Sequence, residues 1–195
     1  MHKLATSFVL GYHGCSSAVA EKVLSGENFK PSKNDFDWLG EGAYFWEANP
    51  RRGLHYYREY CARNNIDAND ATVVGAVIDL ANCLDLTTSS SVEIVKESYE
   101  LTAAVFKQAG QPIPTNGRLP DLLTRRLDCA VINMLFTSRK KSSLPLFDTV
   151  RGIFIEGEPI YPGAGIREKT HIQIAVRNPD CIKGVFKVKK SDIGE

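Results

Sequence analysis

Three short stretches of this sequence contain residue types that suit a ligand site. The first is Tyr12-His13-Gly14, the second has Tyr44 two residues after Gly42, and the third has Gln173. An imidazole can donate and accept hydrogen bonds, and a glycine lets a ligand approach the backbone. An aromatic ring offers a flat face to a planar cation. A glutamine amide can bind hydroxyl groups, but it carries no charge and cannot act as a general base.

Each of these residues also has a plainer explanation when taken alone. His13 suits a hydrogen-bonded turn, Tyr44 a packed strand and Gln173 an edge or surface position. Their predicted positions at strand ends, and the glycines beside two of them, favour one common site.

Alternating and β-rich stretches predict the strands that must position these residues. We expect strands over residues 7–14, 43–46, 72–80, 150–155, 171–176 and 184–188, with 83–86 continuing or pairing with the third. Ser16 or Ser17 should cap a short helix that ends before Gly26. Asn49-Pro50 is typical of a helix start, and that helix should end at Asn64-Asn65.

The segment over residues 91–136 has helical rather than strand periodicity and predicts a helical insertion that lies over the sheets. Strands outnumber helices and are separated by loops, so the class is α+β with largely antiparallel sheets. A basic, serine-rich connector should follow over 137–143. The first predicted apolar face has Val92, Val95, Tyr99, Phe106 and Ala109, and the second has Leu122, Leu123, Leu127, Ala130, Val131, Met134 and Leu135.

Length and composition indicate one domain over residues 1–195. The formal net charge of +1 provides no global attraction to nucleic acid or membranes. The five cysteines are widely spaced, which excludes a short-spaced zinc motif and favours reduced thiols in the cytoplasm. We therefore expect a cytoplasmic protein with no metal and no membrane partner.

The order of the three stretches resembles the His-Tyr-Glu signature of ADP-ribosyltransferases of the diphtheria-toxin and poly-ADP-ribose-polymerase branch. The run WLGEGAYFWEANPRRG is similar to small bacterial members of that superfamily. The resemblance covers most of the chain and is weakest over residues 91–143. It implies two packed, mostly antiparallel sheets that form a cleft for NAD as co-substrate.

The resemblance also implies a role for each motif residue. His13 would donate to the adenosine ribose of NAD, the backbone of Gly14 would pair with the nicotinamide carboxamide, and Tyr44 would stack on the nicotinamide ring. Arg52 or Gly53 falls where the family often has a small hydroxyl residue, so that contact is absent or replaced. Gln173 stands in place of glutamate, which implies weaker stabilisation of the cation and transfer of a single unit rather than chain elongation.

A weakly nucleophilic acceptor needs a general base within hydrogen-bond reach. By family analogy the loop before Gln173 faces the acceptor, so Glu158 is our first candidate. Glu47 and His171 are the alternatives.

The expected function is therefore mono-ADP-ribosyl transfer to a protein, RNA or DNA acceptor, with release of nicotinamide. Related bacterial proteins suggest a toxin or phage-defence effector with an antitoxin or inhibitor partner. The alternatives are a binding module that holds NAD or ADP-ribose without turnover, and an NAD hydrolase. Arg125, Arg126 and residues 139–141 form either a solvated basic face or a contact for phosphates.

Overall fold

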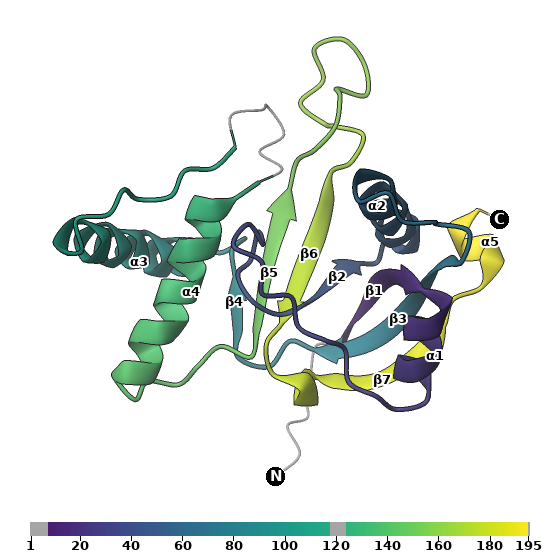
Figure 1. Ribbon diagram of the computed structural model, residues 1–195, viewed down its shortest axis with the longest axis horizontal. Coiled ribbons are helices and arrows are strands. Elements are labelled where there is room, and N and C mark those ends of the chain that lie inside the picture. The colour runs from purple at the N-terminus through teal and green to yellow at the C-terminus, as the bar shows by residue number, and fades with distance from the viewer. Residues whose placement is uncertain (1–7, 118–123, 195) are drawn as a thin grey trace.

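One sheet of seven strands runs through the molecule in the order β4-β5-β6-β2-β1-β3-β7 (Figure 1). The computed structural model describes residues 8–117 and 124–194. The strands are β1 (Phe8–Ser16), β2 (Ala43–Glu47), β3 (Ala71–Asp79), β4 (Cys83–Asp85), β5 (Thr149–Phe154), β6 (His171–Val176) and β7 (Ile182–Lys187). The helices are α1 (Ser17–Leu24), α2 (Pro50–Arg63), α3 (Ser89–Gln108), α4 (Arg126–Lys141) and α5 (Lys190–Ile193), with a 3-10 turn at Pro179–Cys181.

The α+β class is confirmed, but the prediction of two packed sheets is wrong. β2 pairs with β1 on one side and with β6 on the other, so the two halves join into a single sheet. Neighbouring strands are antiparallel except β4 and β5, which are parallel. β4 therefore pairs with β5 and does not continue β3.

The two predicted helix starts are confirmed by their caps. The Ser16 hydroxyl accepts a hydrogen bond from the Val19 N–H at 3.3 Å, and the Asn49 side chain accepts one from the Arg52 N–H at 3.0 Å. Pro50 occupies the first turn of α2, where a missing N–H costs nothing. Local sequence therefore sets where both helices begin.

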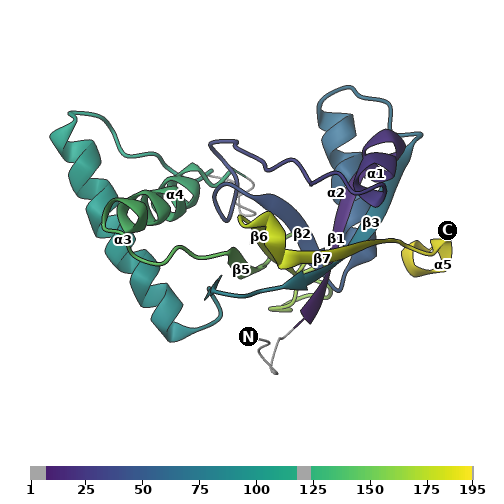
Figure 2. The ribbon, with the colours of Figure 1, turned by 90° about the horizontal axis from the view of Figure 1, so that it is seen from below.

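Helices α3 and α4 form the predicted insertion at the β4 end of the sheet, away from α2 (Figures 1 and 2). The predicted buried face of α3 is right at Val95, which packs against the apolar cluster, and wrong at Val92 and Tyr99, which are 52% and 40% exposed. Ser98 and Thr102 are buried instead, and their hydroxyls donate to the carbonyls of Val131 and Ser98. Small residues that satisfy their hydroxyls on the backbone let the two helices pack closely. Leu122 and Leu123 of the second predicted face lie outside the described residues.

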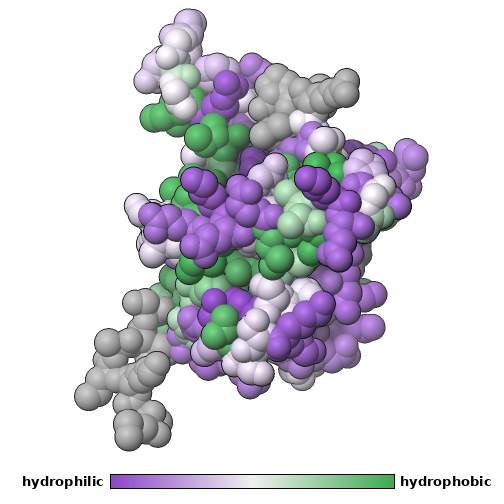
Figure 3. All heavy atoms as spheres, turned by 90° about the vertical axis from the view of Figure 1, so that its left-hand side faces the viewer, coloured by the Kyte–Doolittle hydropathy of each residue, from purple (hydrophilic) through white to green (hydrophobic). Residues whose placement is uncertain are grey.

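The predicted basic connector is largely the end of α4, which runs to Lys141. Cations in the last turn interact favourably with the carboxyl end of the helix dipole. Figure 3 shows the side of the molecule formed by these helices, where polar and apolar side chains are mixed. No helix within the described ranges is long and apolar enough to cross a membrane.

The two faces of the sheet carry separate clusters of apolar side chains. Val23 of α1 packs with Phe45 and Ile78 on one face, which we call the α1 face. Gly53 of α2 packs against β1 on the other, which we call the α2 face. Helix α4 covers the part of the α2 face formed by β5 and β6, where its side chains pack with Val150 and Ala175. The candidate site lies on the α2 face.

Candidate functional site

The strands that carry the three motif stretches are direct neighbours, in the order β6-β2-β1. Tyr44 lies opposite Ala175 in the register, and Gln173 lies opposite Trp46. Because side chains alternate along a strand, Tyr44, Trp46 and Gln173 all lie on the α2 face. Tertiary structure thus brings Tyr44 and Gln173 together.

The pairing of β1 with β2 ends at the pair Tyr12 and Trp46. The Leu10 carbonyl accepts from the Ala48 N–H, so alternate residues of β1, including Gly14, direct their backbone groups toward β2. If the ladder continued, the Tyr44 carbonyl would accept from the Gly14 N–H. This carbonyl is within 2.8 Å of His13 Nδ1, which donates to it. The paired register therefore has a gap at Gly14, whose N–H and C=O lie on the side of β2.

The ring of His13 does not lie with Tyr44 and Gln173. It packs on the α1 face, with centroids 5.2 Å from Phe29 and 5.7 Å from Phe45. Burial lowers its pKa from the ordinary 6.5, which keeps the ring neutral. The period of two along β1 separates the His13 side chain from its glycine neighbour, so His13 holds the Tyr44 backbone in place.

The Tyr44 hydroxyl is already bound within the protein. It donates to the Gly40 carbonyl at 2.7 Å and accepts from the Leu39 N–H at 2.8 Å. Burial raises the pKa of the phenol well above 10. Tyr44 thus anchors the turn before β2, and only its ring is left for a ligand.

The remaining predicted residues have different surroundings. Arg52 is buried, and its Nη2 lies 2.7 Å from Glu156 Oε2, also buried. Glu158 is exposed in the β5–β6 loop, which projects beyond the sheet in Figure 1. Glu47 is paired with Arg151 at 2.7 Å, one residue from Trp46 and so on the α1 face. Glu156 was not predicted as a site residue. It follows Phe154 by two residues, so the alternation of side chains along a strand places both toward the α2 face.

His171 lies on the α2 face, two residues before Gln173, inside a group of aromatic rings. Its centroid is 5.9 Å from Phe154, 6.2 Å from Trp38 and 6.4 Å from Trp46. The Arg125 guanidinium stacks over Trp38 at 4.3 Å. His171 Nδ1 is 2.6 Å from the Lys169 carbonyl, which can only accept, so Nδ1 carries the proton. In the neutral ring, Nε2 is therefore a bare acceptor.

Four buried nitrogens in this region have no hydrogen-bond partner among the described residues: Trp46 Nε1, Arg52 Nε, Arg125 Nε and His171 Nε2. Arg125 lies over the rings of Trp38 and Phe154, which flank His171. Burial lowers the pKa of His171 most, and the charges of Arg52 and Arg125 lower it further. A buried unpaired polar group costs about 1–3 kcal/mol. His171 Nε2 and the three other unpaired nitrogens mark this place as the candidate binding site.

Acidification should weaken the fold through His13 and His171. Burial lowers the pKa of both rings below 6.5, so the unfolded chain takes up protons that the folded chain does not. The free energy of unfolding should therefore fall as pH drops from 7 to 5.5, by up to about 1.4 kcal/mol per pH unit for each histidine. Urea titrations at several pH values measure this slope.

The control for this pH effect is His55, which is exposed. His171→Asn should flatten the slope between pH 7 and 5.5, whereas His55→Asn should leave it unchanged. The same slope in both variants and in the wild type would show that His171 does not contribute.

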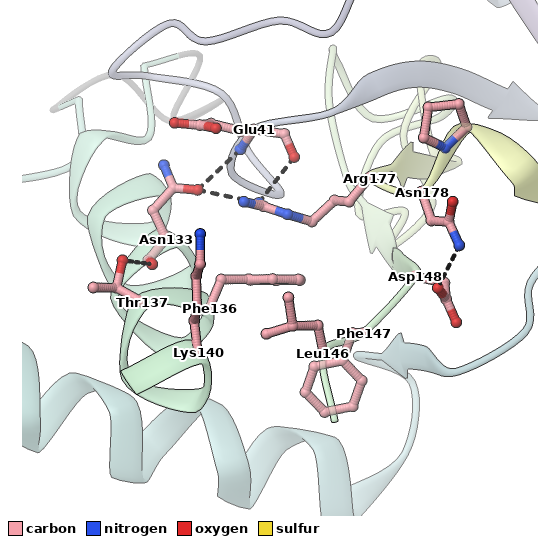
Figure 4. A pocket seen from close by; sticks show the side chains of 11 residues that line it. Glu41, Asn133, Phe136, Thr137, Lys140, Leu146, Phe147, Asp148, Arg177 and Asn178 are labelled. Carbon is pink, nitrogen blue, oxygen red and sulfur yellow. Dashed lines mark hydrogen bonds between the residues drawn. The ribbon is translucent and has the colours of Figure 1, made fainter. Parts of the chain in front are cut away.

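A cavity of about 530 Å³ lies at the other end of β6, beyond its last residue (Figure 4). Arg177 stacks on Phe136 at 3.6 Å and donates to the Glu41 carbonyl and to Asn133. The cavity includes none of the predicted site residues, and its arginine is already well paired. We therefore place the site at His171, where donors are unmet, rather than in this cavity.

Among the described residues, no group of three His, Cys, Asp or Glu side chains is arranged to hold a metal ion. Burial raises the pKa of the Cys15 thiol, close to Gly14, to about 11, so this thiol stays protonated near neutral pH. The side chains around His171 can supply hydrogen bonds, stacking and proton transfer.

Comparison with known proteins gives a relative in the archaeon Methanocaldococcus jannaschii, named "Uncharacterized protein MJ0359". The two sequences are 30% identical over 190 residues, which cover 88% of this chain and 83% of the relative. No family model matches the chain. No solved structure matches it either.

Proposed function

The chain belongs to the family of the archaeal protein MJ0359, and we propose that it is a mono-ADP-ribosyltransferase that cleaves NAD and releases nicotinamide. The observation that carries the proposal is that the paired register of β1 and β2 ends before Gly14, which leaves a gap in the ladder there. A backbone N–H and C=O that face the same gap are the pair that a primary carboxamide matches, one as acceptor and one as donor. The gap is where the nicotinamide of NAD would bind.

The motif residues take their roles around this gap. The ring of Tyr44 forms a wall for the nicotinamide, and Gln173 on the neighbouring strand binds the hydroxyls of the attached ribose. His13 acts from the α1 face as a positioning residue, because it holds the Tyr44 carbonyl through a hydrogen bond. Arg52 supports the site through its ion pair with Glu156 rather than by replacing a small hydroxyl residue.

Gln173 limits the chemistry to what an uncharged amide can do. It can hold the ribose, but it gives no charge to the cation that develops as nicotinamide leaves. Slow transfer of single units to a macromolecular acceptor follows from this. The family role as a toxin or phage-defence effector with an inhibitor partner belongs to the same proposal, and so does action in the cytoplasm.

Release of free nicotinamide from NAD tests the proposal. Gln173→Glu keeps the shape and adds a negative charge beside the developing cation, so release should rise about tenfold or more. Gln173→Ala removes a hydrogen bond and should lower it about threefold to tenfold. Gln111→Glu, which adds the same charge at an exposed position beyond α3, should change nothing.

The outcomes separate three functions. NAD binding without nicotinamide release by any variant would favour the binding module, and release without labelling of any macromolecule would favour a hydrolase. Labelled NAD in cell lysate, followed by separate protease and nuclease digestion, identifies the acceptor class. If NAD does not bind at all, the proposal is wrong.

A further inference from the structure

We propose that the four unpaired nitrogens around His171 form the acceptor site and that they take a nucleobase. The catalytic part of this inference rests on the proposed transferase function. The binding part rests on the side chains alone. The hydrogen-bonding types of the nitrogens, the local charges, the surrounding rings and the distance to Gln173 support these two parts.

The hydrogen-bonding types of these nitrogens exclude some groups as the target that receives ADP-ribose. Trp46 Nε1, Arg52 Nε and Arg125 Nε are donors, whereas His171 Nε2 is an acceptor. A lysine or arginine side chain has only donors and would leave three of these groups unmet. The site requires a ligand with several acceptors and at least one N–H. The edges of nucleobases have this combination.

The local charges are balanced, which disfavours an anionic ligand. Arg52 lies 2.7 Å from Glu156 and 3.3 Å from Glu59, and Glu59 also pairs with Lys169 at 2.8 Å. Arg125 has Asp128 at 3.5 Å. A phosphate or carboxylate next to His171 would face the charge of Glu156 and the lone pair of Nε2. An uncharged ligand avoids both.

The rings around His171 suit a flat ligand. The centroids of Trp38 and Phe154 are 4.5 Å apart, and the planar guanidinium of Arg125 covers both rings, at 4.3 Å and 5.0 Å. A planar group already lies over these ring faces, so they accept a flat partner. Stacking on aromatic side chains is a common way for proteins to hold an unpaired base.

The position of His171 also fits the acceptor of the transfer. His171 and Gln173 lie on one face of β6, about 7 Å apart along the strand, and Tyr44 lies on the far side of Gln173. A nucleobase nitrogen next to His171 can therefore attack C1′ of the ribose held by Gln173. The bond from C1′ to nicotinamide breaks and its electron pair stays with nicotinamide. The proton of the attacking nitrogen passes to His171 Nε2.

Intrinsic fluorescence tests the site directly, because both tryptophans of the chain, Trp38 and Trp46, lie in it. The probes are single-stranded DNA hexamers of each base, an abasic hexamer of the same length, and inorganic phosphate. At least one base-containing hexamer should quench the fluorescence saturably, and the abasic hexamer and phosphate should not.

Two variants refine the test. In His171→Asn the amide can still donate to the Lys169 carbonyl but offers no acceptor at Nε2, so the dissociation constant of that hexamer should rise about fivefold or more. Lys140→Ala, which removes an exposed cation in the cavity at the other end of β6, should leave the dissociation constant unchanged. A larger effect of Lys140→Ala than of His171→Asn would overturn the proposal.

Equal quenching by the abasic hexamer, or no quenching by any hexamer, would also overturn it. Nicotinamide release and nuclease-sensitive labelling from NAD are measured in parallel. If nicotinamide is released but the label is found only on protein, the nucleobase acceptor is wrong while the transferase stands. If a base binds but NAD stays intact, the transferase is wrong and the acceptor role falls with it.

Discussion

Arg52→Met is expected to lower the free energy of unfolding by about 3–5 kcal/mol. The Arg52 and Glu156 side chains are only 7% and 5% exposed, and they meet at 2.7 Å between α2 and the loop after β5. Removing the guanidinium leaves a buried carboxylate without its counter-charge, and that desolvation cost dominates the loss. Denaturant unfolding of the wild type and the variant measures the difference.

The matched control is Arg126→Met. Arg126 and Asp35 also form an ion pair, at 3.0 Å, but the two side chains are 52% and 71% exposed. Water screens such a pair, so its loss should cost less than about 1 kcal/mol. The double variant Arg52→Met/Glu156→Met should recover much of the stability, because no buried charge remains. Equal losses in Arg52→Met and Arg126→Met would contradict this account.

Gly14→Ala is expected to destabilise the fold by about 3 kcal/mol or to prevent folding. A Cβ at this position would lie 2.1 Å from the Gly53 carbonyl oxygen and 2.9 Å from the Tyr57 Cβ. The oxygen belongs to the backbone of α2, so the helix itself would have to move away from β1. Thermal unfolding and the yield of folded protein report the effect.

Gly184→Ala in β7 is the control, because a Cβ there meets no atom within 4 Å. Its effect should stay within about 0.5 kcal/mol. The comparison also changes how Gly14 is interpreted. Close packing of α2 is enough to require a glycine at this position. Loss of activity in Gly14→Ala would therefore not be evidence for a bound carboxamide. The Gln173 variants are the sharper functional test.

The candidate site divides one face of β6 into regions with different chemistry. Ala175 lies next to Tyr44, Gln173 next to Trp46, and His171 among the rings near Arg125. Under the proposed function, this order corresponds to leaving group, ribose and acceptor. Under the same function His171 is the general base, because Glu47 is ion-paired on the other face and Glu158 is exposed.

Local signals were sufficient for most secondary structure. The cap at Asn49 and the proline after it predicted the start of α2, and the structure confirms both. The strand over residues 171–176 was predicted with the bounds that β6 has. These features depend on a few adjacent residues, and their hydrogen bonds are made within the same segment.

Features that depend on contacts between distant segments were not predictable in this way. The periodicity of α3 suggested that Val92 and Tyr99 are buried. Ser98 and Thr102 face α4 instead, because closely packed helices favour small residues at their contact. Likewise, Glu156 becomes a buried charge only because Arg52 meets it from α2.

The amino-acid sequence by itself determined where α1 and α2 begin, most of the strands and which residue types are available for chemistry, since each follows from neighbouring residues and the geometry of the backbone. Only the tertiary structure decided that the strands form a single sheet, that the His13 ring faces away from Tyr44 and Gln173, and that His171 lies among unpaired donors. The face that a side chain occupies depends on strand register, which partners far apart in the chain establish.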